Sequence, residues 1–408
     1  MRKKNYIMFV VALLLCFWTT NLVFADEENT EEETIKTVSF LQGFETNIKE
    51  RVLPDPLPRY VYDSGLNFEY PDAVRGIFLT GHSAGNSKFE GLIDYINNTA
   101  LNAMVIDVKD DNGYITYKYA EDSPYFEASR NFISEPRAML ERLEEEQIYP
   151  IARVVVFKDT YLAHKKPEWS FKENGQIWEN GNKDAFVNPF VKDVWKYNVE
   201  IAKEAAKLGF QEIQFDYVRF PEGFERRDEI LEYSRGDYDD ASLDNVKERV
   251  KAVSEFVAYA KKELEPYQVD VSVDIFGYSA TIEEAPGIGQ NFTKISENVD
   301  VISSMIYPSH WGPGYFDIPF PDKEPYRLVD EYAKKENEVL AKLENAPTSR
   351  PWIQDFTASW LYRGSPFVYG PKQVQAQIEA LYANGIYEYL IWDPSNKYTR
   401  GVDYDPKN

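Results

Sequence analysis

The sequence predicts an α/β protein with the (β/α)8 TIM-barrel fold, and three observations lead to this prediction. Eight short apolar runs alternate with amphipathic stretches of helical spacing, which is typical of parallel strands joined by crossover helices. Eight strands is the number that closes such a sheet into a barrel. The chain has 408 residues, enough for a barrel of about 250 residues with long insertions. A doubly wound open sheet is the main alternative, and the domain is expected to span residues 71–402.

The predicted strands are apolar runs in which β-branched and aromatic residues are frequent, as in buried strands of a parallel sheet. They cover residues 76–80, 103–108, 150–157, 212–217, 269–276, 301–307, 351–356 and 387–393. Three helices between them have clear ends, because glycine and proline terminate helices. Residues 194–208 are followed by Gly209, residues 246–264 by Pro266, and residues 371–382 by Gly385.

Two connections are long and rich in aromatic residues. Residues 158–189 follow the third strand and carry Trp169 and Trp178, and residues 308–325 follow the sixth strand and carry Trp311. Long loops with ordered aromatic residues are usually functional. Both loops follow strands, so in a barrel both lie at the catalytic mouth.

The first 70 residues differ from the rest of the chain. Residues 1–25 have a basic start, an apolar run over 7–18 and a small residue at position 25, which is the pattern of a secretory signal peptide. The alternative is an uncleaved anchor, which would be the only link to a membrane. Residues 26–70 are acidic and then proline-rich, and are expected to form a spacer. Cys16 is the only cysteine, so a cleaved chain has neither disulfides nor a catalytic thiol.

The charge of the chain limits its partners. Lys and Arg total 45 against 68 Asp and Glu, which gives a net charge of −23. Nucleic acid and anionic lipid are bound mainly through basic residues, so neither is an expected partner. Neutral and cationic substrates are compatible with this net charge.

Carboxylates stand at the ends of five predicted strands. In a barrel, side chains at the carboxyl ends of strands point into the site. Hydrolysis of a glycosidic bond needs two carboxyl groups, and aromatic rings at the mouth would stack against sugars. The alternative is that these residues cap helices or pair with basic side chains. The five carboxylates are Asp107, Asp216, Asp274, Asp355 and Asp393.

The catalytic pair is predicted to be Asp216 and Asp274. Asp216 lies in an apolar run with Arg219 three residues later, and Asp274 has a similar setting in the next strand. A buried charge persists only when it is paired or used, and Arg219 could pair with Asp216 or hold a substrate hydroxyl. Neighbouring strands would bring the two carboxyl groups within catalytic reach. Which of them is the acid stays open at this point.

Other chemistries are less well supported. Residues 81–85 (GHSAG) match a nucleophile elbow around Ser83, with Asp274 and His310 downstream, but almost no sheet precedes them, and a Gly/Ser turn explains the same letters. Residues 110–113 (DDNG) resemble a calcium loop, but the ligand register fails. The three histidines are dispersed, and neither a phosphate-binding loop nor an H-E-x-x-H motif occurs, so no metal and no cofactor is expected.

Four segments resemble the bacterial putative glycosyl hydrolase domain family. They are residues 102–113, 209–221, 350–356 and 391–399, within a match from about residue 72 to 399. One departure is Asp393, where the closing motif is expected to carry Asn. The resemblance implies a TIM barrel related to the alpha-amylase-like glycoside hydrolases, and glycoside hydrolysis as its activity.

We therefore expect a secreted or surface-tethered enzyme that hydrolyses a bacterial wall or extracellular polysaccharide. Asp216 and Asp274 would be catalytic, and Trp169 and Trp178 would be outer stacking platforms. A non-catalytic glycan-binding barrel is the alternative, followed by a serine esterase acting on acetylated glycan through Ser83. The remaining substrate-binding residues would be Asp107, Arg219, Tyr307, Trp311, Asp355 and Asp393.

Overall fold

The computed structural model describes residues 35–40, 44–49, 61–239 and 242–406, which fall into two compact units divided after Tyr60. In the first unit, β1 (Ile35–Phe40) and β2 (Phe44–Lys49) pair as an antiparallel hairpin. The predicted signal peptide and about half of the predicted spacer lie outside the described residues. In the described part of the chain, no helix combines the length and the apolar character needed to cross a membrane.

The second unit is a closed barrel of eight parallel strands. Each strand pairs with the next in chain order, and the last pairs with the first. The predicted (β/α)8 barrel is therefore confirmed, and the open-sheet alternative is wrong. The barrel strands are β3 (Arg75–Leu79), β4 (Ala103–Lys109), β5 (Tyr149–Val155), β8 (Glu212–Asp216), β9 (Asp270–Phe276), β10 (Val301–Met305), β12 (Trp352–Gln354) and β13 (Tyr389–Trp392), with β11 (Thr348–Ser349) as an extension beside β10.

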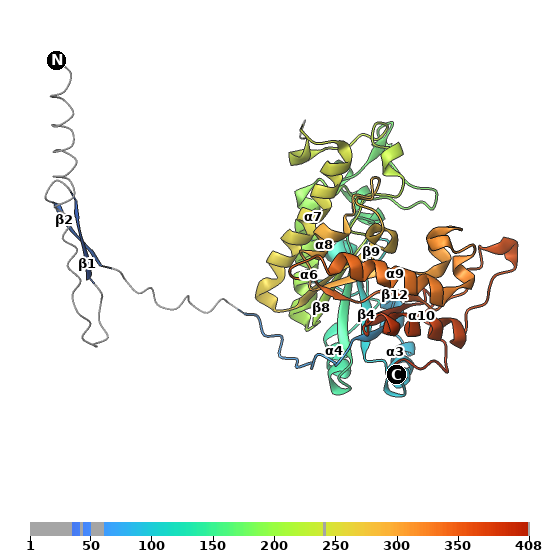
Figure 1. The fold of residues 1–408 in the computed structure, drawn as a ribbon. Helices are drawn as coiled ribbons and strands as arrows, with labels where there is room; N and C mark the ends of the chain where they lie inside the picture. Colours follow the sequence, from blue (N-terminus) through green and yellow to red (C-terminus); the bar gives the residue numbers. More distant parts are fainter. Residues whose placement is uncertain (1–34, 41–43, 50–60, 240–241, 407–408) are drawn as a thin grey trace, which may run out of the picture. The chain divides into compact units, whose positions relative to one another are not determined.

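Helices lie outside the strands, and α6 and α7 lie side by side next to β8 (Figure 1). The three helices predicted with clear ends are α6 (Lys192–Leu208), α7 (Asn245–Leu264) and α10 (Pro371–Ala383). Gly209 follows α6 with a φ of 119°, a backbone conformation that favours glycine. The other helices of the barrel are α3 (Lys88–Asn97), α4 (Pro136–Glu145), α8 (Phe292–Ser296) and α9 (Pro325–Leu340), with the short α2 (Gly81–Ala84) and α5 (Thr160–Lys165) in loops.

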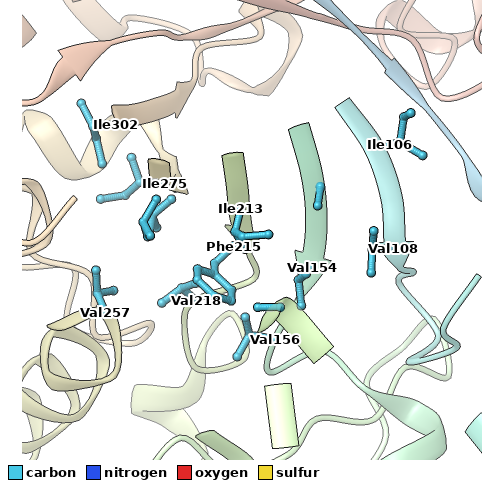
Figure 2. Close-up of a cluster of buried hydrophobic side chains, with 14 of the residues drawn as sticks. Ile106, Val108, Val154, Val156, Ile213, Phe215, Val218, Val257, Ile275 and Ile302 are labelled. Atoms are coloured by element: carbon cyan, nitrogen blue, oxygen red, sulfur yellow. The ribbon is translucent and has the colours of Figure 1, made fainter. Parts of the chain in front are cut away.

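The apolar core fills the layer between strands and helices (Figure 2). Outward-facing side chains such as Ile213 and Phe215 on β8 are fully buried, and Val257 of α7 packs in the same cluster. This alternation explains why the strands are apolar runs interrupted by single polar residues. Every second residue faces the helices, and the residues between them face the barrel interior.

The barrel interior is polar along β8 and β9. Glu212 at the floor forms a fully buried ion pair with Arg350 at 2.6 Å. Gln214 above it donates a hydrogen bond to the Ser303 hydroxyl at 3.2 Å. Asp216 is the next inward position, so the polar column ends at the mouth. The inward-facing side of β8 therefore places the carboxylate of Asp216 at the carboxyl end of the strand.

Residues 61–70, the end of the predicted spacer, belong to the same compact unit as the barrel. The Tyr70 hydroxyl accepts a hydrogen bond from Arg350 at 2.9 Å and donates one to Glu388 at 2.9 Å. Leu66 and Phe68 pack against the apolar core. This segment therefore covers the floor of the barrel, at the end opposite to the mouth.

The two long loops follow β5 and β10, as expected. The first carries α5 and a small hairpin of β6 (Lys172–Glu173) and β7 (Gln176–Ile177), and the second carries three short 3-10 turns. A third long connection, between β8 and α7, was not predicted. Because these segments follow strands, all of them lie at the carboxyl ends of the barrel strands.

Candidate active site

A cavity of about 240 Å³ opens at the carboxyl ends of the strands. Four of the predicted site residues line it, namely Asp216, Arg219, Asp274 and Tyr307. The full lining consists of Asp111, Arg153, Asp216, Tyr217, Arg219, Glu222, Asp274, Phe276, Met305, Tyr307, His310, Trp352 and Trp392.

Asp216 and Asp274 face each other from neighbouring strands. The preceding residues, Phe215 and Val273, are direct partners in the parallel pairing of β8 and β9. The two carboxylates therefore stand at the same level, and their side chains are 5% and 2% exposed. The structure thus brings the predicted pair together in one buried place.

The carboxylate of Asp216 is held by three donors. Arg153 donates from Nε at 2.9 Å and from Nη2 at 2.6 Å to Oδ2, and the backbone amide of Tyr217 donates at 2.6 Å to Oδ1. A guanidinium that makes two hydrogen bonds to a carboxylate is a strong ion-pair partner. Asp216 is therefore an oriented carboxylate.

Arg153 also binds two further carboxylates and was missed by sequence reasoning. Its Nη1 donates to Asp107 at 2.7 Å, and its Nη2 donates to Asp111 at 2.8 Å. The sequence contains a pattern that identifies Arg153 as a candidate. Arg153 is a charge inside the otherwise apolar run 150–157, much as Asp216 is in its own strand. Burial raises the pKa of Asp107 to about 7, although Arg153 opposes this rise.

Asp274 has a different environment from Asp216. Burial raises the pKa of Asp274 well above its usual value, and the nearby charge of Asp216 raises it further. Its only hydrogen-bond donor among the described residues is the indole of Trp352, at 2.7 Å from Oδ1. Burial also raises the pKa of Tyr307, with the two carboxylates adding to the rise, so this phenol stays neutral.

Arg219 stacks between two aromatic rings of the cavity. Its guanidinium lies 4.7 Å from the centre of the Tyr217 ring and 4.6 Å from that of Phe276. Its ion-pair partner is the exposed Glu222 at 3.2 Å, and Arg153 holds Asp216 instead. Arg219 therefore has donors available at the cavity wall.

The backbone at the end of β8 is strained. Tyr217 has a φ of 53°, in the left-handed region that non-glycine residues rarely adopt. This conformation turns the amide of Tyr217 back onto the carboxylate of Asp216. Strained residues of this kind cluster at functional sites.

A second cavity of about 400 Å³ adjoins the first, and Asp107 lines it. The two cavities share Asp111, Arg153 and Trp392. Trp392 stacks on Phe78 with ring centres 4.1 Å apart, which makes an aromatic wall on β13 and β3. In the closed barrel this wall lies opposite β8 and β9, the strands that carry the carboxylate pair.

Asp355 and Asp393 lie outside the lining of both cavities. Asp355 accepts hydrogen bonds from the backbone amide of Thr399 at 2.7 Å and from its hydroxyl. Burial raises the pKa of Asp355 to about 6. Asp393 accepts hydrogen bonds from the amide and hydroxyl of Ser395 at 2.7 and 2.6 Å. Both carboxylates therefore fasten the segment that follows β13.

The same segment reaches the first strand of the barrel. Asn396 accepts a hydrogen bond from the Thr80 amide at 3.1 Å and donates one to the Phe78 carbonyl at 2.8 Å. The Tyr398 hydroxyl donates to the same carbonyl. Residues 393–399 thus connect the mouth ends of β12, β13 and β3.

The three predicted tryptophans also lie outside the lining of both cavities. Trp311 is 9% exposed and packs edge-on against Tyr315 with ring centres 4.6 Å apart. Trp178 is 8% exposed and contacts Phe186. Trp169 is half-buried, with the Lys166 amine 5.3 Å from its ring centre. Trp178 and Trp311 belong to the main apolar core, and Trp169 packs against it.

The other two motifs have local partners. Ser83 contacts Thr80 at the start of α2, with 3.2 Å between their hydroxyl oxygens, while the imidazole of His310 lies 3.1 Å from the Ser309 hydroxyl. Residues 110–113 form a tight turn in which Gly113 donates to the Asp110 carbonyl at 3.0 Å. Over the described residues, no cluster of three or more His, Cys, Asp or Glu is arranged to hold a metal ion.

Comparisons with known proteins agree with this architecture. In sequence, the chain is 34% identical to a hypothetical protein from Ruminiclostridium thermocellum over 48% of this chain and 96% of that one, with a TM-score of 0.41. The fold is similar to the glycoside hydrolase domain of PgaB (BpsB) from Bordetella bronchiseptica, with 14% identity, a TM-score of 0.51, and coverage of 79% of this chain and 94% of that one. No curated protein matches. A family model described as a putative glycosyl hydrolase domain matches residues 76–398, most of the sequence, and the chain belongs to that glycosyl hydrolase family.

Proposed function

We propose that this domain hydrolyses glycosidic bonds of a bacterial wall or extracellular polysaccharide, with Asp274 as the general acid and Asp216 as the nucleophile or base. One observation carries the proposal. Two buried carboxyl groups stand at one level of one cavity, yet their surroundings differ, because Asp216 is paired with Arg153 whereas burial raises the pKa of Asp274. Glycosidases assign their acid and their carboxylate through such differences.

Asp274 suits the acid. Its raised pKa favours the protonated carboxyl group, and this proton can pass to the leaving glycosidic oxygen. The Trp352 indole occupies Oδ1, which leaves Oδ2 to carry the proton. Burial of the site strengthens this arrangement, because water does not compete for the carboxyl group.

Asp216 suits the second role. The ion pair with Arg153 fixes the orientation of its carboxylate, with a backbone amide as a third donor. A negative charge at this point stabilises the positive charge that develops on the sugar ring in the transition state. The bond to the leaving group breaks as Asp274 protonates it, and Asp216 attacks the anomeric carbon or activates the water that does.

The lining of the two cavities bears on the class of sugar. It contains six carboxyl groups, from Asp107, Asp110, Asp111, Asp216, Glu222 and Asp274, against the guanidinium groups of Arg153 and Arg219. A polymer of uronic acids would be repelled by this excess of negative charge. Neutral or amine-bearing sugars fit it, and the Phe78–Trp392 wall offers them an apolar stacking face.

The test is release of reducing sugar from a panel of bacterial wall and extracellular polysaccharides. We expect the wild type to release sugar and Asp216→Asn and Asp274→Asn to lose at least 10³-fold in rate. Asp322→Asn is the matched control, because Asp322 is also a buried carboxyl near the mouth but lies outside both cavities. Polysaccharide that is bound but never cleaved by the wild type would contradict hydrolysis and favour the non-catalytic glycan-binding barrel.

We also propose that the protein is secreted through its first 25 residues. The support is their sequence pattern, with a basic start, an apolar run and a small residue before the acidic stretch. Amino-terminal sequencing of the exported protein is expected to begin at Asp26. A chain that keeps Met1 and sediments with membranes would instead indicate the uncleaved anchor.

A further inference from the structure

We infer that the substrate is a long polysaccharide chain that crosses the whole barrel mouth and is cut internally, not from one end. This inference rests on the proposed function and adds to it the mode of attack. The observation that supports it is that candidate binding surfaces extend from the Asp216–Asp274 cavity in two opposite directions.

In one direction, three cavities adjoin one another in a row, which we call the groove. The central cavity shares Asp111, Arg153 and Trp392 with the second one, and the second shares Asn112 and Tyr114 with a third of about 420 Å³. The third cavity lies between the loop after β4 and helix α5, which follows β5. The second and third cavities each reach the roughly 300–1,000 Å³ of ordinary ligand pockets, so the groove exceeds the needs of a single sugar.

The far end of this groove has the chemistry of a sugar subsite. The rings of Tyr114 and Tyr161 lie 5.5 Å apart and are both half-buried. The guanidinium of Arg130 stacks on one face of the Tyr114 ring, 3.8 Å from its centre, and this contact holds the ring in place. His164 and Lys165, which also line the cavity, supply polar groups for sugar hydroxyls.

In the other direction, aromatic rings lead outward from the central cavity. His310 lines that cavity and lies 5.8 Å from the ring of Trp360, with Phe356 6.0 Å from the same ring. Trp360 is 60% exposed, so its indole face is available to a ligand. A large exposed aromatic residue at the end of such a series is a natural stacking platform for a pyranose.

The strand order shows that these two ends lie opposite each other. In the closed order β3, β4, β5, β8, β9, β10, β12, β13, the loops after β4 and β5 lie across the mouth from the loops after β10 and β12. The carboxylate pair on β8 and β9 and the aromatic wall on β13 and β3 then form the two sides of the groove. A chain lying along it has sugars on both sides of the bond to be cut, which is the geometry for internal cleavage.

The test follows product size and chain length on the polysaccharide that the panel identifies. We expect the mean chain length to fall early, while the first soluble products are oligosaccharides. Trp360→Ala and Tyr114→Ala, at the two ends, are each expected to raise KM for long chains about tenfold and to change KM for the shortest cleaved oligosaccharide by less than twofold. Tyr387→Ala is the control, because Tyr387 is 52% exposed but precedes β13 at the floor.

The outcomes separate the two proposals. Steady release of a mono- or disaccharide while the remaining chains stay long would overturn internal cleavage and leave the hydrolase in place. Equal effects of both variants on long and short substrates would also overturn the extended groove. No release from any polysaccharide by the wild type would instead overturn the proposed function.

Discussion

The indole N–H of Trp352 donates a 2.7 Å hydrogen bond to Oδ1 of Asp274, inside a cavity where that carboxyl group is 2% exposed. A donor to a carboxylate favours its charged form, so this bond lowers a pKa that burial and Asp216 raise. Trp352 therefore partly offsets the rise in the pKa of Asp274.

Replacing Trp352 tests this relationship through the pH dependence of the rate. Trp352→Phe removes the donor, so the pKa of Asp274 rises and the acid stays protonated to higher pH. We expect the alkaline limb of kcat/KM to move upward by about one pH unit, while the maximal rate falls about tenfold. Trp392→Phe is the control, since no hydrogen bond joins Trp392 to Asp274. If the alkaline limb of Trp352→Phe lies at the same pH as that of the wild type, the titration of Asp274 does not set this limb.

Replacing Arg153 is expected to damage both activity and stability. Arg153→Met leaves the buried carboxylates of Asp107 and Asp216 without their cation, which costs about 3–5 kcal/mol of unfolding free energy. Turnover should fall at least 10²-fold, because Asp216 loses its orientation. Denaturant unfolding and kinetics measure the two effects. Arg219→Met is the stability control and should cost less than about 1 kcal/mol, since its partner Glu222 is exposed.

The stereochemical course follows from the strand register. Asp216 and Asp274 are equivalent positions on neighbouring parallel strands, which lie about 5 Å apart. We expect the two carboxyl groups to keep about this spacing, and separations of about 5–5.5 Å are typical of retaining glycosidases. We therefore expect the first product formed to keep the anomeric configuration of the substrate. Proton NMR of the nascent anomer is the measurement, and an inverted anomer would contradict direct attack by Asp216.

The floor of the barrel depends on the ion pair between Arg350 and Glu212. Arg350→Met is expected to destabilise the fold by about 3–5 kcal/mol, because Glu212 is left buried and unpaired. The double variant Arg350→Met with Glu212→Leu should recover much of this loss, since two apolar side chains need no partner. Chemical denaturation of the single and double variants makes the comparison. A double variant as unstable as the single one would show that the damage comes from packing.

Asp270, near that floor, should make stability depend on pH. Burial raises its pKa to about 6, with further increases from Glu212 and Asp300. The folded state therefore binds more protons than the unfolded state between about pH 4 and pH 6, and stability from this group falls as pH rises through that window. Asp270→Asn removes the dependence. Relative to wild type, its Tm should improve between pH 4.5 and pH 7, and a constant difference would contradict the assignment.

The fold could be predicted because buried parallel strands have a recognisable sequence pattern, a short run of apolar residues. The strands of the barrel are largely apolar runs, and Asp216 and Asp274 are carboxylates near the carboxyl ends of two of them. Arg153 is a charge in a similar apolar run, but the sequence alone favours the cation nearest in sequence, Arg219, as the partner of Asp216. Which cation reaches a carboxylate depends on strand neighbours, and β5 lies beside β8.

The aromatic residues of the loops could not be assigned from sequence in the same way. An aromatic residue in a long loop either stacks on a ligand or fills the apolar core, and composition does not distinguish the two. Trp178 and Trp311 are buried in the main apolar core, whereas Trp360, in the loop after β12, is exposed beside the cavity. The difference arises from packing between segments far apart in the chain.

The clasp formed by residues 393–399 has a consequence for synthesis. The ribosome releases the strands β3 and β4 first, but a domain generally folds as one unit. The wall made by Phe78 and Trp392 needs both ends of the barrel sequence, and Asn396 and Tyr398 fasten it to the Phe78 carbonyl. A nascent chain that stops before residue 393 therefore has no finished groove, so the hydrolase cannot act on glycans until its last strand and the clasp have been made.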